Sequence, residues 1–118
     1  MSQQRDQIGP IGAVRKVDET VLASITGVID VTNSPAVRGG LIALVNSHRP
    51  KKLVLNLAGV SYMDSSALAV LVEMVRKVGK SGRVVLTDLQ PRVRGLLEIA
   101  RLDTIFQIAA SEQEALAK

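Results

Sequence analysis

The fold of this chain is decided by the stretch LVLNLAGVSYMDSSALAV, residues 53–70. It starts with a nearly continuous apolar run over residues 53–57, which is typical of a strand buried on both faces. After a short turn, apolar residues recur at the spacing of a helix. Asp64, Ser65 and Ser66 therefore lie where a buried strand passes into a helix N-terminus. Free N–H groups and the positive end of the helix dipole would favour a phosphate group there.

Strands and helices alternate on both sides of this stretch. Upstream, residues 14–17 and 20–26 are predicted to form a hairpin, and a helix is predicted to start at Asn33 or Ser34 and to end at His48. Downstream, the pattern predicts a helix over 65–78, a strand over 83–87, a helix from Pro91, a short strand over 104–108 and a final helix capped by Ser111.

The order of these elements predicts the fold class and the domain boundaries. Two strands followed by alternating helices and strands indicate an α/β fold with a mixed, mostly parallel sheet, an N-terminal hairpin and about four helices. Residues 1–12 are polar and punctuated by glycine and proline, so we expect a flexible N-terminal arm there. Residues 13–118 are expected to form one domain.

The amino-acid composition and charge of the chain limit the classes of function that we expect for it. The 118 residues include no cysteine, the N-terminus lacks an apolar signal core, and no apolar run approaches the length of a membrane span, so we predict a soluble cytoplasmic protein without membrane insertion. The net charge of +4 is spread along the chain in small groups, Arg49/Lys51/Lys52 and Arg76/Lys77/Lys80/Arg83, which we interpret as solvated surface. With one Tyr, one Phe and no Trp, stacking platforms for nucleic acid are missing, and no direct nucleic-acid binding is expected.

The sequence offers little for catalysis. His48 is the only histidine, and it falls in the last turn of the first predicted helix, where it suits the terminal carbonyls or the surface. No phosphate-binding loop, dinucleotide motif or metal-ligand cluster occurs, so we predict no enzyme activity, no cofactor and no metal site. A small hydrolase that uses Ser65 or Ser66 stays as a remote alternative. From residue chemistry alone, residues 64–66 are either a helix cap or a functional site.

A family resemblance favours the functional site. The stretch 53–70 resembles the signature of STAS domains, and in particular the bacterial anti-sigma factor antagonists (anti-anti-sigma factors), in which an apolar strand leads to Asp-Ser-Ser-Gly-Leu and a helix. Residues 27–30, Gly-Val-Ile-Asp, are similar to the family's second landmark, which ends an early strand. The similarity covers nearly the whole predicted domain. The chain departs from the family at Ala67, where glycine is usual.

The resemblance implies a phosphorylation switch. By position, Ser65 would be phosphorylated by a partner that is both an anti-sigma factor and a histidine-kinase-like ATPase acting as a serine kinase, and a phosphoserine phosphatase would reverse the reaction. Asp30, Asp64, Ser65, Ser66 and Ala67 would form the partner-binding surface. The unphosphorylated form would bind the anti-sigma factor and release the sigma factor, whereas the phosphorylated form would not.

The same family allows a second interpretation. STAS domains also occur as adaptor subunits of ABC-type lipid transporters and in signalling scaffolds, where no phosphorylation cycle operates. The uninterrupted Asp-Ser-Ser at residues 64–66 favours the switch over the adaptor.

Overall fold

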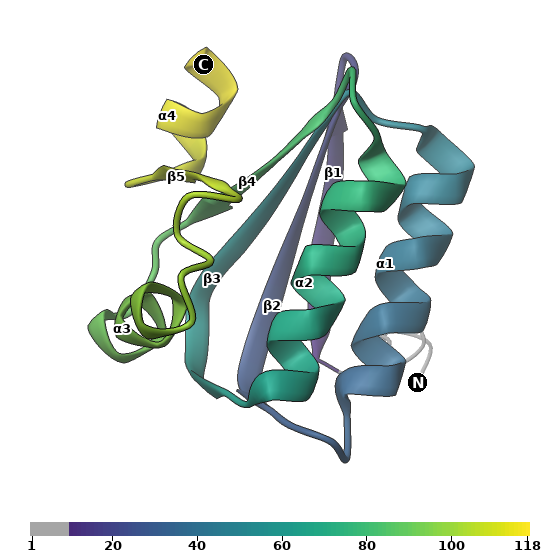
Figure 1. Cartoon of the computed structure of the whole chain (residues 1–118). Coiled ribbons are helices and arrows are strands. Elements are labelled where there is room, and N and C mark those ends of the chain that lie inside the picture. Colours follow the sequence, from purple (N-terminus) through teal and green to yellow (C-terminus); the bar gives the residue numbers. More distant parts are fainter. Residues whose placement is uncertain (1–9) are drawn as a thin grey trace.

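The computed structural model describes residues 10–118, which form five strands and four helices (Figure 1). These are β1 (Ile11–Val17), β2 (Thr20–Ile29), α1 (Ser34–His48), β3 (Lys52–Met63), α2 (Ser65–Val78), β4 (Arg83–Thr87), α3 (Pro91–Ile99), β5 (Gln107–Ala109) and α4 (Glu112–Ala117). The element order confirms the predicted α/β class. None of these helices is long and apolar enough to cross a membrane.

The five strands lie in the sheet in sequence order, β1-β2-β3-β4-β5. β1 pairs with β2 in antiparallel fashion, as the hairpin prediction required, and all later pairs are parallel. β1 and β5 are the edge strands. Because β1 begins at Ile11, residues 11–12 belong to the sheet and not to the expected N-terminal arm. The rest of that arm, residues 1–9, lies outside the described residues.

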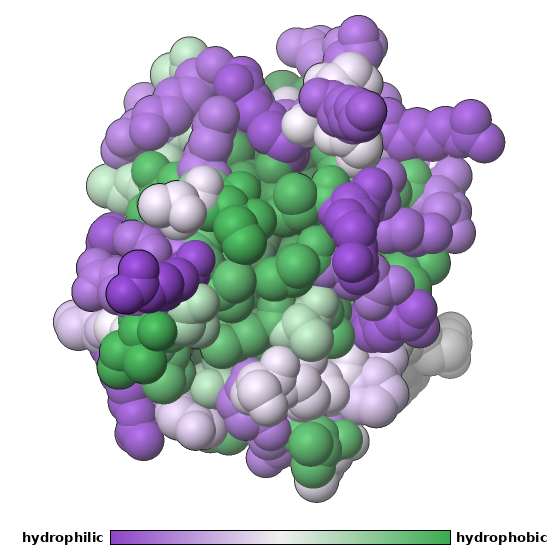
Figure 2. All heavy atoms as spheres, in the orientation of Figure 1, coloured by the Kyte–Doolittle hydropathy of each residue, from purple (hydrophilic) through white to green (hydrophobic). Residues whose placement is uncertain are grey.

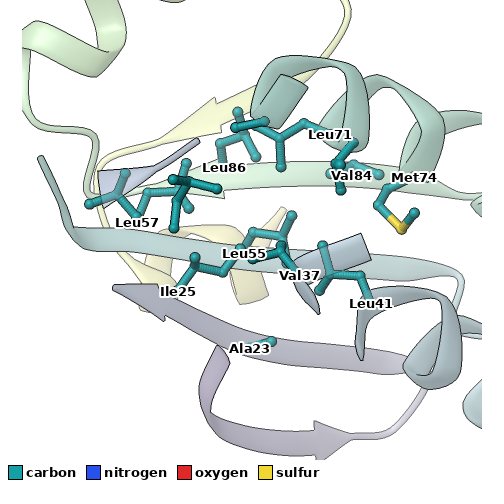
Figure 3. Packing of buried hydrophobic residues seen from close by; sticks show 14 of the residues in the cluster. Ala23, Ile25, Val37, Leu41, Leu55, Leu57, Leu71, Met74, Val84 and Leu86 are labelled. Atoms are coloured by element: carbon teal, nitrogen blue, oxygen red, sulfur yellow. The ribbon is translucent and has the colours of Figure 1, made fainter. Parts of the chain in front are cut away.

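The main core lies between the sheet and helices α1 and α2, which run side by side across one face (Figure 1). Alternating residues of the strands, with the inward faces of both helices, fill this layer (Figure 3): Ala23, Ile25, Val37, Leu41, Leu55, Leu57, Leu71, Met74, Val84 and Leu86. A smaller cluster on the opposite face joins Leu22, Val54, Val85 and Ala109 to Ala115 of α4. The near-continuous apolar sequence of β3 follows from this burial on both faces.

β3 is longer than the sequence indicated. The sequence predicts that the apolar strand ends at Leu57 and is followed by a short turn, but the strand continues to Met63. The reason is its neighbour: β2 also continues past its predicted end, and the parallel pairing extends to Ile29 opposite Met63. Gly59 permits this pairing, because a Cβ at this position would lie 2.7 Å from Thr26 Cγ2. The two central strands therefore end at the same level.

Two further details differ from the prediction, and one helix cap agrees with it. Asn33 precedes α1 but does not cap it with its side chain. Its amide instead closes the preceding turn, accepting from Asp30 N–H and donating to the carbonyl of Val28. β5 starts later than expected, at Gln107, because the residue before it turns inward and buries the Phe106 ring in the main core. The Ser111 cap is confirmed, since its hydroxyl accepts the N–H of Glu114.

Polar contacts hold α4 on the second face of the sheet. The Lys52 ammonium is buried and donates to the carbonyl of Ala115 over 2.7 Å. Glu112 accepts hydrogen bonds from Asn56 of β3 and from Arg15 of β1, so one carboxylate links α4 to two strands. Burial, together with the nearby Arg83, lowers the pKa of Lys52.

Adjacent glycines in α1 provide a matched test of the packing. A Cβ on Gly40 would overlap Ile11 Cδ1 of β1, whereas a Cβ on Gly39 meets nothing within 4 Å. We expect Gly39→Ala to stabilise the domain by about 0.5–1 kcal/mol, because alanine is the better helix former. Gly40→Ala should be less stable than Gly39→Ala by about 0.5–1.5 kcal/mol, because the flexible end of the Ile11 side chain must turn aside into a less favourable rotamer. Urea unfolding measures both; equal stabilisation would show that the end of the Ile11 side chain moves aside without a cost in stability.

Candidate functional site

The site lies where β2 and β3 end side by side. Ile29 is paired with Met63. The residues that follow them, Asp30 and Asp64, therefore leave the sheet at the same end, where β2 and β3 finish. The backbone confirms this neighbourhood, because Asp64 N–H donates to the carbonyl of Ile29 over 3.1 Å. The carboxyl ends of parallel strands are the usual place for binding sites in α/β sheets. The structure thus brings together two acidic residues that are 34 positions apart in the sequence.

The Asp64 carboxylate caps α2. One of its oxygens, Oδ1, accepts the backbone N–H groups of Ser66 and Ala67 over 2.9 and 3.1 Å, and the Ser66 hydroxyl over 2.6 Å. The hydroxyl of Ser66 contributes most to lowering the pKa of Asp64, followed by the backbone N–H groups of Ala67, Ser66 and Val31; partial burial opposes them. Asp64 is therefore held as an anion at the positive end of the helix.

The two serines have different surroundings. Ser66 is half-buried, and its hydroxyl is committed to Asp64. Ser65 is the first residue of α2 and is exposed. Its hydroxyl takes part in none of the side-chain hydrogen bonds found among residues 10–118. Of the two hydroxyls, only that of Ser65 is both accessible and uncommitted.

Asp30 shapes the loop between β2 and α1. Its carboxylate accepts the N–H and the hydroxyl of Thr32, and its carbonyl accepts the N–H groups of Asn33 and Ser34. The side chain is half-buried, so Asp30 acts first as the organiser of the loop. The loop in turn places the backbone of Val31 close to the Asp64 carboxylate.

Ala67 was predicted to belong to the partner-binding surface, but its side chain points inward. Only 2% of Ala67 is exposed, and its methyl group is part of the main core. Alanine in place of the family's glycine therefore changes the packing below α2 and not the outer surface of the site. The backbone N–H of Ala67 is also engaged, with Asp64.

α3 is fixed beside the same end of the sheet. The guanidinium carbon of Arg92 lies 4.7 Å from the centre of the Tyr62 ring, a cation–π contact between α3 and β3. Gln90 adds a hydrogen bond of 2.7 Å from its side-chain amide to the carbonyl of Ala58. These contacts with the end of β3 add to the anchoring of α3, whose Val93 and Leu97 are buried in the main core.

Sequence reasoning missed the apolar surroundings of the site. Val28 and Val31 are 47% and 68% exposed next to Asp30. A signal was present, since a valine between an aspartate and a threonine in a predicted turn is unusual for a purely solvated loop. α2 adds a half-buried apolar flank, directed away from α1 and formed by Leu68, Val72 and Val75. Figure 2 shows a continuous apolar area between α2 and α3.

The polar groups of the site lie far from the single histidine of the chain. His48, the single imidazole of the chain, ends α1 at the opposite end of the domain from Ser65. Within residues 10–118, no group of three or more His, Cys, Asp or Glu side chains is arranged to hold a metal ion. What the site presents is an exposed hydroxyl, two carboxylates and exposed valines on a rigid strand-end platform.

The low pKa of Asp64 gives a pH-dependent prediction. A carboxylate with a lowered pKa stabilises the folded state at neutral pH, and this stabilisation is lost as the pH falls below the ordinary value of 3.8 towards the lowered one. We expect Asp64→Asn to unfold at lower urea concentration than the wild type at pH 7, with the difference shrinking below about pH 4. A difference that is unchanged at pH 3 would mean that Asp64 is not held as an anion by its contacts.

Comparison with known proteins places these features in a family. The model of the STAS domain matches residues 13–115. The anti-sigma-B factor antagonist of Bacillus subtilis is 33% identical over 103 residues, which cover 85% of this chain and 91% of that protein. An anti-sigma F factor antagonist of Paenibacillus polymyxa is 28% identical over 97 residues, covering 81% and 83% of the two chains.

Solved structures agree with the fold. The crystal structure of an anti-sigma factor antagonist from Mycobacterium paratuberculosis superimposes with a TM-score of 0.81 at 27% identity, covering 89% of both chains. The unphosphorylated form of the anti-sigma factor antagonist SpoIIAA gives a TM-score of 0.75 at 23% identity, covering 88% of this chain and 91% of SpoIIAA, and shows the likeness of the fold alone. The match to the family model, together with the 33% identity to a relative covered almost end to end, establishes that this chain belongs to the STAS domain family.

Proposed function

We propose that this protein is an anti-sigma factor antagonist whose binding to an anti-sigma factor is switched by phosphorylation of Ser65. The observation that carries the proposal is the contrast between the two serines: Ser65 is exposed and uncommitted, whereas Ser66 is half-buried and bonded to Asp64. The names of the similar proteins support the kind of partner, since the relatives from Bacillus and Paenibacillus are antagonists of anti-sigma factors.

The switch has a simple electrostatic basis. Phosphorylation adds a charge of about −1.5 to −2 and three acceptor oxygens to Ser65. The adjacent Asp64 carboxylate already occupies the N–H groups of Ser66 and Ala67. The phosphate therefore cannot use those donors without displacing Asp64, and it remains directed towards solvent or towards a bound partner. A surface that contacts a neutral hydroxyl would have to desolvate a dianion beside a carboxylate, which weakens binding.

The exposed valines would supply part of the binding energy. Interfaces depend on a few apolar or aromatic anchors surrounded by polar contacts. Val31 is the most exposed apolar side chain next to the carboxylates. We assign to it the role of an apolar contact for the anti-sigma factor, with Ser65 as the neighbouring charge-sensitive position.

The assignment of Ser65 is tested by phosphorylation of matched serine variants. The cognate ATPase, captured with the wild-type protein, is incubated with labelled ATP and each variant. We expect Ser65→Ala to take up no phosphate, because the accepting hydroxyl is gone. Ser66→Ala should still be phosphorylated, although it loses a contact of Asp64 and should unfold at lower temperature. Undiminished phosphate uptake by Ser65→Ala would refute the assignment.

The effect of charge is tested by affinity capture. Wild-type and Ser65→Asp proteins are immobilised, and the retained proteins are identified by mass spectrometry. We expect the wild type to retain an anti-sigma factor with an ATPase domain, and the acidic variant to bind it at least about tenfold more weakly. Ser65→Asn controls for size without charge. Equal capture by wild type and Ser65→Asp would contradict a charge switch, and retention of a transporter ATPase with its permease would indicate the adaptor function.

The apolar contact is tested with two valines. Val31→Ser should weaken binding of the purified partner by about tenfold, as expected for an apolar anchor. Val14→Ser is the control, because Val14 is 42% exposed on β1, away from the site. Calorimetric titration of both variants measures the affinities. If the two substitutions have the same effect, Val31 is no specific contact.

A further inference from the structure

Two basic groups that are separate in the sequence meet at one end of the fold. Because the helices run antiparallel to the parallel strands, the ends of α1 and α2 lie beside the beginnings of β3 and β4 (Figure 1). This end is opposite to Ser65, which starts α2. We call it the basic end and define it by the cations that it gathers: Arg49, Lys51, Lys52, Lys77, Lys80 and Arg83. The charge is therefore concentrated in space, although it is dispersed along the chain.

Nearby negative groups do not neutralise the basic end. Asp18 and Glu19 lie in the β1–β2 turn at this end, and Glu19 pairs with Lys51 over 3.7 Å. The Glu73 carboxylate, near enough to Lys77 for that cation to help lower its pKa, is itself bonded through both oxygens to Arg38 and is counted with that partner. Six cations against two carboxylates leave an excess of four charges, equal to the net charge of the whole chain. Two helix C-termini contribute about half a negative charge each, which still leaves about three positive charges. The favourable interaction of cations with the two helix C-termini therefore does not account for the whole cluster of positive charge.

A cleft opens in the middle of the basic end. It has a volume of about 480 Å³, within the range of small-molecule sites, and it lies between the ends of α1 and α2. Arg49, Lys51 and Lys77 line it, together with the neutral polar side chains of Asn46 and Ser81. No carboxylate lines this cleft.

The floor of the cleft is apolar, and its rim is fixed by the backbone. Val45 and Val78 form part of the floor. The backbone N–H groups of Arg49 and Gly79 close the last turns of α1 and α2 by donating to the carbonyls of Val45 and Val75. These carbonyls are thereby engaged, and none of the side-chain hydrogen bonds or ion pairs found within residues 10–118 uses Arg49 or Lys77.

We infer that this cleft binds a phosphate-bearing ligand, with Arg49, Lys51 and Lys77 holding the phosphate and Asn46 and Ser81 as additional hydrogen-bond partners. Cations with free N–H donors and a neutral polar rim match the oxygens of a phosphate group, and the apolar floor suits an attached organic part.

The proposal is independent of the Ser65 switch. The cleft and Ser65 lie at opposite ends of α2, so a ligand in the cleft and a partner at Ser65 would not compete for space. Failure of one proposal leaves the other standing, because each has its own variants and its own readout.

Titration with inorganic pyrophosphate tests the site directly. Amide chemical shifts of the ¹⁵N-labelled protein are followed at low salt. We expect saturable shifts confined to residues 45–51 and 77–83. Arg49→Gln/Lys77→Gln should lower the affinity at least about tenfold, because charge-assisted hydrogen bonds are lost. Arg94→Gln/Arg101→Gln removes the same charge elsewhere and should bind within about twofold of the wild type.

Vesicles distinguish a lipid headgroup from a free phosphate compound. Wild type and both double variants are sedimented with vesicles of phosphatidylglycerol and phosphatidylcholine, or of phosphatidylcholine alone. Pyrophosphate binding without sedimentation identifies a free ligand, and sedimentation lost only in the cleft variant identifies a headgroup. The proposal is overturned if neither probe binds, if both double variants bind equally weakly, or if the wild-type shifts centre on the start of α2.

Discussion

The pairing of β2 with β3 up to their last residues is the constraint on which the site depends. Ile29 lies opposite Met63, so the chain leaves both strands at the same level and Asp64 can bond to the backbone of Ile29. A shift of this register by one residue would turn the inward side chains of β3 to the other face and move Asp64 away from the loop that follows β2. The register is specified because the two faces of β3 differ: Leu53, Leu55 and Leu57 lie in the main core, whereas Lys52 and Asn56 on the other face bond to α4. The geometry of the site therefore follows from the packing of the sheet.

The capping contact gives three consecutive residues different roles. Asp64 satisfies the first free N–H groups of α2 and holds the Ser66 hydroxyl, which leaves Ser65 outside this network. A helix cap and a modification site are therefore compatible explanations of the same motif, because the cap uses one serine and exposes the other. The local stability of the helix start does not depend on the Ser65 hydroxyl.

Most of the fold could be predicted from periodicity, since helical and strand spacing reports which residues face the core. The extension of β3 could not, because residues 59–62 look like a turn locally and become a strand only through pairing with β2. Candidate site residues 64–67 follow from the likeness of the Asp-Ser-Ser stretch to the family, and Asp30 follows from residues 27–30. The inward direction of the Ala67 side chain depends on the helix phase that the core sets. The sequence also does not predict that Arg49 and Lys77 line the same cleft, because separation along the chain does not say which helix ends lie together.

The edges of the sheet have a consequence for how this domain associates. One edge strand, β1, carries the exposed charged residues Arg15 and Lys16. The other edge strand, β5, is only three residues long. Charged and short edge strands are the common means by which proteins avoid pairing their sheets with one another. Strand addition is therefore disfavoured at both edges. Contacts made through side chains at the helix ends can form and dissociate without extending the sheet.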